Sequence, residues 1–234
     1  MNIGFDVISD LNLDAEDHFN WEGKATSLYL IIAGNISNDL RIIHQTLIHL
    51  SHYYQGIFYI SGESEHDSMH FVKHRNQEIA GLCKSVRNVA YLHKHVVIIN
   101  GIALVGCNGW YGNKIEELDD DLAKLHLMNQ NVEEVTYLAN SLEKLQLHLD
   151  VKKIVVVTHS VPGQGLFFGE EPTNISEYSP PQQALLSDTE SKVSHWVYGS
   201  YDKTVDTSID KITYINNSAF NTDPYWPKRI TVEI

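Results

Sequence analysis

Short apolar runs of the kind that form buried strands recur along the whole chain, and helical periodicity follows several of them. The clearest runs are LYLIIA at 28–33, IFYI at 57–60 and IVVVT at 154–158. Runs that are apolar throughout predict strands with both faces covered, and their alternation with helical segments predicts an α/β fold. A length of 234 residues favours one large domain over two small ones. We therefore expect a single α/β domain that spans residues 1–234.

Hydrophobic spacing predicts further elements in the first half of the chain. Alternating apolar residues at 3–8 predict a strand. Apolar residues at helical spacing from 40 to 54 predict a helix, with Ser37 or Asn38 as its N-cap. A second helix is expected from about Ser68 to Leu82.

The second half begins with a predicted hairpin at 95–106, because two apolar runs flank an Asn100-Gly101 pair that suits a type I′ turn. The segment 118–149 is expected to be helical, and the asparagines near 129–131 are a candidate break between two helices. Its apolar positions form one stripe, which consists of Leu118, Leu122, Leu125, Val132, Val135, Leu138, Leu142, Leu145 and Leu149. The last third returns to strands.

The charge balance argues against several classes of function. The chain has 17 Lys and Arg against 30 Asp and Glu, a formal net charge of −13. General nucleic-acid binding and docking on an anionic membrane both need an excess of cations. No run approaches the roughly 20 apolar residues of a membrane span, and the N-terminal sequence lacks the features of a signal peptide. We expect a cytoplasmic protein in which Cys83 and Cys107 are free, buried thiols.

Polar clusters directly follow five of the expected strands. The clusters are SDLN at 9–12, GNIS at 34–37, GESE at 62–65, HSVP at 159–162 and GSYD at 199–202. In an open α/β sheet, ligands gather beyond the carboxyl ends of the strands. We therefore expect the side chains of these five clusters to converge on one rim.

In this order, the clusters resemble the motif blocks of the calcineurin-like metallophosphoesterases. That family carries D-x-H, G-D, G-N-H-D/E, H and G-H-x-H, and the corresponding letters here are D-L-N, G-N, G-E-S-E, H and G-S-Y-D. The resemblance covers nearly the whole chain. It implies a β-sandwich of two mixed sheets flanked by helices.

The resemblance also implies positions for two metal ions and a catalytic histidine. By position, the first metal would be held by Asp10, Asn12, Asn35 and Asp202. The second would be held by Asn35, Glu63, His159 and Ser200. The position of the family's catalytic histidine is occupied by Ser64.

Most of these positions have lost the family's residue type, and only Asp10 and His159 keep it. Asn35 stands where the family's bridging aspartate would be, and an amide offers one neutral oxygen and an NH₂ group that cannot ligate a cation. Ser64 cannot act near neutral pH as the general acid that imidazole would be. His66 lies two residues further on and could substitute for that imidazole, but we expect it to be a surface residue.

We therefore expect a metallophosphoesterase-like protein without a two-metal centre, whose status as an enzyme is open. It would act by binding a protein partner or a phosphate-bearing molecule in the cleft that holds the metals in the family. It would contain no metal or one weakly bound Mg²⁺, Mn²⁺ or Ca²⁺. The alternative is an active metal-dependent phosphoesterase or phosphodiesterase. It would use one hard cation at the oxygen-rich positions Asp10, Asn12, Asn35 and Asp202.

Overall fold

The computed structural model describes residues 2–66, 72–109, 118–163, 166, 191–220 and 225–234. Within these ranges the strands form two sheets. The first sheet has the order β11-β1-β2-β3-β4. Its strands are β1 (Asn2–Ile8), β2 (Tyr29–Ala33), β3 (Gly56–Ile60), β4 (Val89–Tyr91) and β11 (Lys228–Glu233). It is mixed, because β11 runs antiparallel to β1 while the other neighbours are parallel.

The second sheet has the order β5-β6-β7-β8-β10-β9. Its strands are β5 (His95–Ile99), β6 (Ile102–Cys107), β7 (Lys153–Thr158), β8 (Val193–Tyr198), β9 (Val205–Ile209) and β10 (Ile212–Asn216). The strands β6, β7, β8 and β10 are parallel, and the edge strands β5 and β9 are antiparallel to their neighbours. The expected turn at Asn100-Gly101 is confirmed, with φ angles of 47° and 86°.

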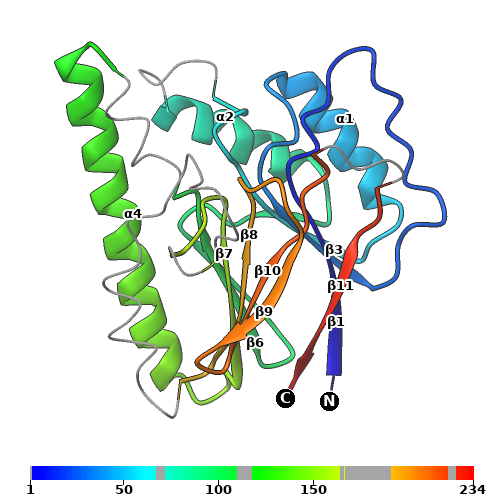
Figure 1. Cartoon of the computed structure of the whole chain (residues 1–234), viewed down its shortest axis with the longest axis vertical. Helices are drawn as coiled ribbons and strands as arrows, with labels where there is room; N and C mark the ends of the chain where they lie inside the picture. Colours follow the sequence, from blue (N-terminus) through cyan, green and yellow to red (C-terminus); the bar gives the residue numbers. More distant parts are fainter. Residues whose placement is uncertain (1, 67–71, 110–117, 164–165, 167–190, 221–224) are drawn as a thin grey trace.

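The two sheets pack face to face, and helices cover their outer faces. Side chains of both sheets, among them Phe5, Ile31 and Val155, share one buried apolar cluster. Residues of α1 (Leu40–Ser51) and α2 (Val72–Ser85) pack on the outer face of the first sheet, and residues of α4 (Asp121–Leu147) pack on the second. Figure 1 shows α4 on one side of the strands and α1 and α2 on the other. The predicted fold class, a sandwich of two mixed sheets flanked by helices, is confirmed.

The N-cap of helix α1 (Leu40–Ser51) lies one residue after Asn38 and two after Ser37, the two caps predicted from the sequence. Its cap is Asp39, whose carboxylate accepts a hydrogen bond from the backbone N–H of Arg41 at 2.7 Å. The hydroxyl of Ser37 has another role, because it donates to the carbonyl oxygen of Leu13 at 2.7 Å. Helix α2 (Val72–Ser85) extends beyond the predicted end at Leu82, and its predicted start at Ser68 lies outside the described residues.

Helix α4 (Asp121–Leu147) differs most from the prediction. It is continuous through the expected break at 129–131, where Gln130 and Asn131 are buried. The predicted stripe is wrong in the N-terminal half, where Leu122, Leu125 and Val132 are 78%, 55% and 64% exposed, and at its last member, Leu149, which is 85% exposed and lies beyond the helix. The buried face there carries polar residues that apolar spacing cannot reveal. No helix in the described ranges is long and apolar enough to cross a membrane, and both cysteines are free and buried as predicted.

Candidate functional site

The loops that carry the predicted site residues meet at one edge of the two sheets. The backbone N–H of Asp10 donates to the carbonyl oxygen of Gly34 at 3.0 Å, which joins the loops after β1 and β2. The N–H of Gly199 donates to the carbonyl oxygen of His159 at 2.9 Å, which joins the loops after β8 and β7. The expected convergence of strand ends is therefore observed. We call the eight positions Asp10, Asn12, Asn35, Glu63, Ser64, His159, Ser200 and Asp202 the candidate site.

Asp10 is the buried carboxylate of the candidate site. Its Oδ1 accepts from the amide Nδ2 of Asn35 at 3.1 Å, and its Oδ2 accepts from the backbone N–H of Ser200 at 3.1 Å. Burial raises the pKa of Asp10, and the nearby positive charge of His159 only partly opposes that rise. Protein donors thus contact both carboxylate oxygens.

Asn35 links three loops through its amide side chain. The Nδ2 group donates to Asp10, and the Oδ1 atom accepts from the backbone N–H of Ser64 at 3.0 Å. The atom that faces the neighbouring carboxylate is therefore a donor, which would oppose a cation placed between the two side chains. An amide fits this position as a hydrogen-bonding bridge between protein groups and does not fit it as a ligand shared by two metals.

His159 is fully buried, and both of its ring nitrogens face acceptors. Nδ1 donates to the carbonyl oxygen of Ala33 at 2.7 Å, and Nε2 lies 2.8 Å from Oε2 of Glu63. Burial lowers the pKa of His159, but the charge and hydrogen bond of Glu63 outweigh burial and raise it to about 9. A protonated ring has no lone pair to offer a metal. The Glu63 carboxylate is hydrogen-bonded to Nε2, the ring nitrogen that would have to bind a metal.

Three glycines let the loops close around the His159 ring. A Cβ on Gly34 would lie 2.8 Å from the Cγ atom of His159, and a Cβ on Gly62 would lie 2.6 Å from its Nε2. A Cβ on Gly199 would lie 2.9 Å from Nδ1. These distances are shorter than real Cβ contacts. The His159 ring is therefore held in a pocket that only glycine backbones can line.

The remaining positions lie toward the surface. The Ser64 hydroxyl donates to Oδ1 of Asn12 at 3.0 Å. The residue at the position of the family's catalytic histidine is thus hydrogen-bonded to the residue at one of the ligand positions of the first metal. Ser200 is half-buried and contacts Asp10 through its backbone. Asp202 is exposed, and none of the hydrogen bonds among the described residues joins it to the other seven positions.

Backbone strain is concentrated at the candidate site. Asp10, Asn12, Asn35 and Ser200 have φ angles of 55°, 45°, 57° and 57°. Each residue held in this left-handed region costs of order 1 kcal/mol or more. Such strain persists where the surrounding contacts fix the backbone, and it is typical of functional loops. The loop geometry is therefore imposed by the contacts around it.

Sequence reasoning gave Glu65 no structural role, although it closes the GESE cluster. Glu65 is fully buried, and its carboxylate accepts from the backbone N–H groups of Asn35, Ile36 and Gly62 at 3.1, 2.6 and 2.7 Å. The Tyr59 hydroxyl donates to it at 2.9 Å. Glu65 thus fixes the β2 and β3 loops relative to each other. The only signal was its place at the end of a polar cluster.

The prediction that His66 lies on the surface is wrong. His66 is buried, with Nδ1 at 2.9 Å from the carbonyl oxygen of Gly62 and Nε2 at 3.2 Å from Oδ1 of Asn76. Burial lowers its pKa to about 4 despite those two contacts. His66 is therefore bound inside the protein next to the candidate site, with hydrogen-bond partners at both ring nitrogens.

The residues present do not fit the two-metal centre that the fold implies. Among the described residues, no group of three or more His, Cys, Asp or Glu side chains is arranged to hold a metal ion. The donor set gives the reason, because the bridging position is an amide with its NH₂ turned inward and the remaining imidazole is bound on both nitrogens.

No protein-family model matches the sequence, and no curated protein matches it. Solved structures do match. The phosphopantetheinyl hydrolase PptH from Mycobacterium tuberculosis is 14% identical with a TM-score of 0.68, over 98% of this chain and 96% of that one. A Staphylococcus aureus protein described as a 5′-nucleotidase, in complex with α-ketoglutarate, is 11% identical with a TM-score of 0.57, over 100% of this chain and 51% of that one. GAP50, the anchor in the inner membrane complex of Plasmodium, is 10% identical with a TM-score of 0.53, over 92% and 71%. These matches confirm the metallophosphoesterase fold expected from the sequence.

Proposed function

We propose that this metallophosphoesterase-fold protein works by binding, and that a network of side-chain hydrogen bonds has replaced the two-metal centre. The observation that carries the proposal is the environment of His159. Its two ring nitrogens contact Ala33 O and Glu63 at 2.7 and 2.8 Å. An imidazolium bound in this way stabilises the loops of the site and has no free position for a metal.

The charges of the buried residues of the candidate site also support the proposal that hydrogen bonds have replaced the metals. The cation of His159 interacts with the carboxylates of Asp10 and Glu63, both of which raise its pKa. In a metal centre, the ions would supply the positive charge that draws such carboxylates together. In this protein the imidazolium of His159 would supply that positive charge.

The accessible edge of the site offers hydrogen-bonding groups and little positive charge. Asn12 and Asp202 are exposed, and Ser64 is half-buried. A phosphate dianion would meet Asp202 and the net charge of −13 without a lysine or arginine among the eight positions. Charge therefore favours a protein partner as the occupant of the cleft over a phosphate-bearing molecule. GAP50 shows that a protein with this fold can be an anchor.

The alternative is hydrolysis of a phosphate ester or diester with one hard cation. The observation that favours it is the similarity to a phosphopantetheinyl hydrolase along nearly the whole of both chains. A cation among Asp10, Asn12, Asn35 and Asp202 would require the Asn35 amide to turn its oxygen inward. That rotation would break the hydrogen bonds to Asp10 and Ser64, which counts against the alternative.

Metal analysis distinguishes the proposed binding function from hydrolysis with a single cation. Protein purified without chelator is expected to contain no stoichiometric pair of Mn, Fe or Zn ions. Mg²⁺ or Ca²⁺ is expected to leave the melting temperature unchanged, since only a ligand that binds the native state raises it. A saturable rise at sub-millimolar Mg²⁺ or Ca²⁺ that is lost in Asp10→Asn or Asp202→Asn would support the single-cation alternative. Two tightly bound ions per chain would overturn the proposal.

Hydrolysis of aryl phosphomonoesters and phosphodiesters in Mn²⁺ or Mg²⁺ is expected to stay near background. A variant with the family's residues restored should gain metal binding first and turnover second. Its substitutions are Asn12→His, Asn35→Asp, Glu63→Asn, Ser64→His, Ser200→His and Asp202→His. Turnover of the unmodified protein at ordinary enzyme rates, about 1 s⁻¹ or more, would establish the alternative if Asp10→Ala and His159→Ala each abolished it.

A further inference from the structure

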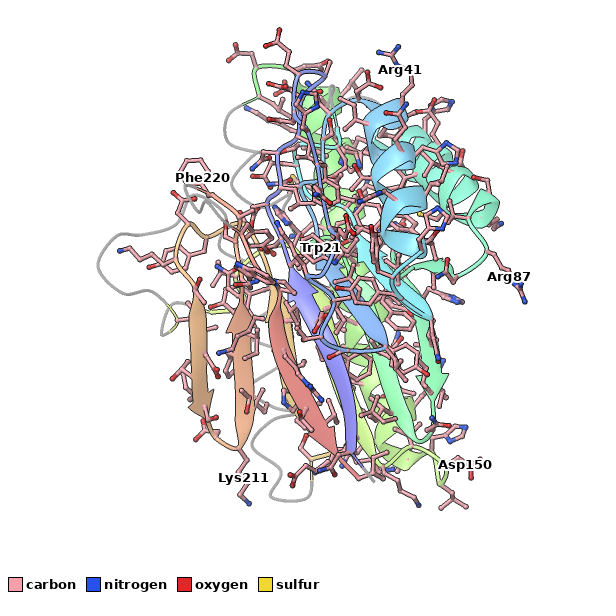
Figure 2. The ribbon with its side chains drawn as sticks, turned by 90° about the vertical axis from the view of Figure 1, so that its right-hand side faces the viewer. Trp21, Arg41, Arg87, Asp150, Lys211 and Phe220 are labelled. Carbon is pink, nitrogen blue, oxygen red and sulfur yellow. The ribbon has the colours of Figure 1, made fainter. Side chains whose placement is uncertain are left out.

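The two halves of helix α4 are held on the second sheet by different kinds of contact. Figure 1 shows α4 running alongside the strands, and Figure 2 shows Asp150, just beyond its C-terminal end, at the opposite end of the molecule from Arg41. In the C-terminal half, the leucines at 138–145 are buried in the apolar cluster of the second sheet. The N-terminal half, residues 121–134, buries only two apolar residues, Ala123 and Leu127. The other apolar side chains of this half are exposed, and these are Leu122, Leu125, Met128 and Val132.

Polar contacts of the N-terminal half converge on one turn of the helix. Glu134 is fully buried, and its Oε2 accepts from the backbone N–H of Gly109 at 3.0 Å while its Oε1 lies 3.2 Å from Nδ1 of His93. The neighbouring Glu133 accepts from Nζ of Lys94 at 2.9 Å. His93 and Lys94 both belong to the connection between β4 and β5. This connection and the loop after β6 therefore hold the N-terminal half of α4 through charged groups.

The ring of His93 is enclosed, and its contact with Glu134 is poorly aligned. The side chain is 11% exposed, and the ring stacks on Tyr91 with centroids 5.8 Å apart and an interplanar angle of 25°. Among the described residues, Nδ1 has no well-aligned hydrogen bond, although the carboxylate of Glu134 is within reach. Buried polar atoms normally have such partners. The ring is thus a site where an added charge would be poorly solvated.

The groups around His93 favour its neutral form in the docked helix. Burial lowers the pKa of His93, and the charge of Lys94 lowers it further. The carboxylates of Glu134 and Glu133 oppose this shift without cancelling it. A histidine with a folded-state pKa below its ordinary value of 6.5 makes the folded arrangement less stable as the pH falls through that value. The titratable groups that face the ring are Tyr91 from β4, Lys94 from the same connection, His66 from the loop after β3, and Glu133 and Glu134 from α4.

We propose that His93 and Glu134 form a latch that holds the N-terminal half of α4 on the second sheet at neutral pH and releases it in acid. A proton added to the enclosed ring creates a charge that water solvates better once the helix has moved away, so docking weakens. Release of this half costs few apolar contacts, because its buried face is largely polar. The C-terminal half stays in place, because the leucines that hold it do not titrate. The latch lies outside the eight positions of the candidate site and does not depend on the function proposed for them.

Amide hydrogen exchange at about pH 7.5 and about pH 5 tests the latch, because it reports the local opening of each part of the helix. Rates are corrected for the intrinsic pH dependence of exchange. In the wild-type protein, the amides of residues 121–132 are expected to exchange severalfold faster at the lower pH, while those of 138–147 stay unchanged. His93→Gln removes the titrating ring and is expected to abolish the difference.

Three further variants show which group is responsible. Glu134→Gln keeps an acceptor for Gly109 but removes a charge that raises the pKa of His93, so the release should move to lower pH. His66→Gln should keep the response, because burial lowers the pKa of His66 to about 4 and that ring stays neutral at about pH 5. His95→Gln replaces an exposed histidine two residues from His93, and this matched control should also keep the response.

Several results would overturn the proposal. An unchanged rate at 121–132 in the wild-type protein would show that acid does not release the helix. An equal response in His93→Gln would show that another group takes up the proton. Equal acceleration in both halves of α4 would indicate a general loss of stability and no latch. A release that stayed at the same pH in Glu134→Gln would show that Glu134 does not act on the ring. Melting temperatures at about pH 7.5 establish that each variant is folded.

Discussion

A Gly34→Ala variant is expected to lose more than about 3 kcal/mol of folding free energy, because backbone strain and a core clash act together. Gly34 has a φ of 89°, a conformation that L-residues rarely adopt. The added Cβ would lie 2.8 Å from the Cγ atom of His159 and 2.9 Å from the backbone nitrogen of Gly62. The ring cannot move aside without breaking its bonds to Ala33 and Glu63. Urea unfolding monitored by tryptophan fluorescence measures the loss.

Gly23 provides a matched control for this substitution. It has a φ of 73°, and a Cβ there would meet nothing within 4 Å. Gly23→Ala therefore measures the backbone term alone, about 1 to 2 kcal/mol. The difference between the two variants isolates the close packing around His159. Equal losses in Gly34→Ala and Gly23→Ala would mean that the loops of the candidate site are not closely packed around the ring.

The strands were predictable because a strand that is covered on both faces is apolar throughout, and such a run is visible in the local sequence. Apolar runs such as 28–33 and 154–158 are covered on both faces, and they coincide with β2 and β7 to within one residue at the N-terminal end. The turn at Asn100 and Gly101 was predictable for the same reason, since few residue pairs adopt two positive φ angles in succession.

The buried face of α4 was not predictable, because tertiary contacts determine it. Glu134 is fully buried, accepts from the backbone N–H of Gly109 at 3.0 Å, and lies 3.2 Å from Nδ1 of His93. A helix that packs against polar partners buries polar residues, and its exposed side then carries the leucines. Hydrophobic periodicity assumes an apolar partner, so it predicted the wrong face in this half of the helix.

The convergence of the loops that carry the candidate site was predictable, and the contacts between their side chains were not. Motif order placed Glu63 and His159 at the same edge of the fold, but nothing in the sequence indicates that they form an ion pair across 96 positions of the chain. The burial of His66 depends on Asn76, which lies on another element. Contacts of this kind come from three-dimensional packing.

Glu63→Gln is expected to lower the free energy of unfolding by about 2 to 3 kcal/mol near neutral pH, because it removes the charge that keeps His159 protonated in the interior. Glutamine keeps the size of the side chain and can still accept from Nε2, so the loss reports the charge. Glu22→Gln, at an exposed carboxylate, is the matched control and should change stability little. A loss at Glu63 no larger than at Glu22 would mean that the ion pair contributes nothing.

The pH dependence of that loss identifies the protonated ring as its source. The pKa of His159 is about 9 in the folded state against an ordinary value of 6.5. Protonation therefore stabilises the fold fully below pH 6.5, and this contribution is lost as the pH rises through about 9. The pKa values of Asp10 and Glu65 are also raised by burial, so each carboxyl likewise makes the folded state less stable as the pH rises above its ordinary pKa. Unfolding curves from pH 6 to 10 should show the wild-type protein and Glu63→Gln converging as His159 deprotonates. A gap that stayed constant across this range would mean that His159 is neutral, and Nε2 would then have a lone pair available for a metal.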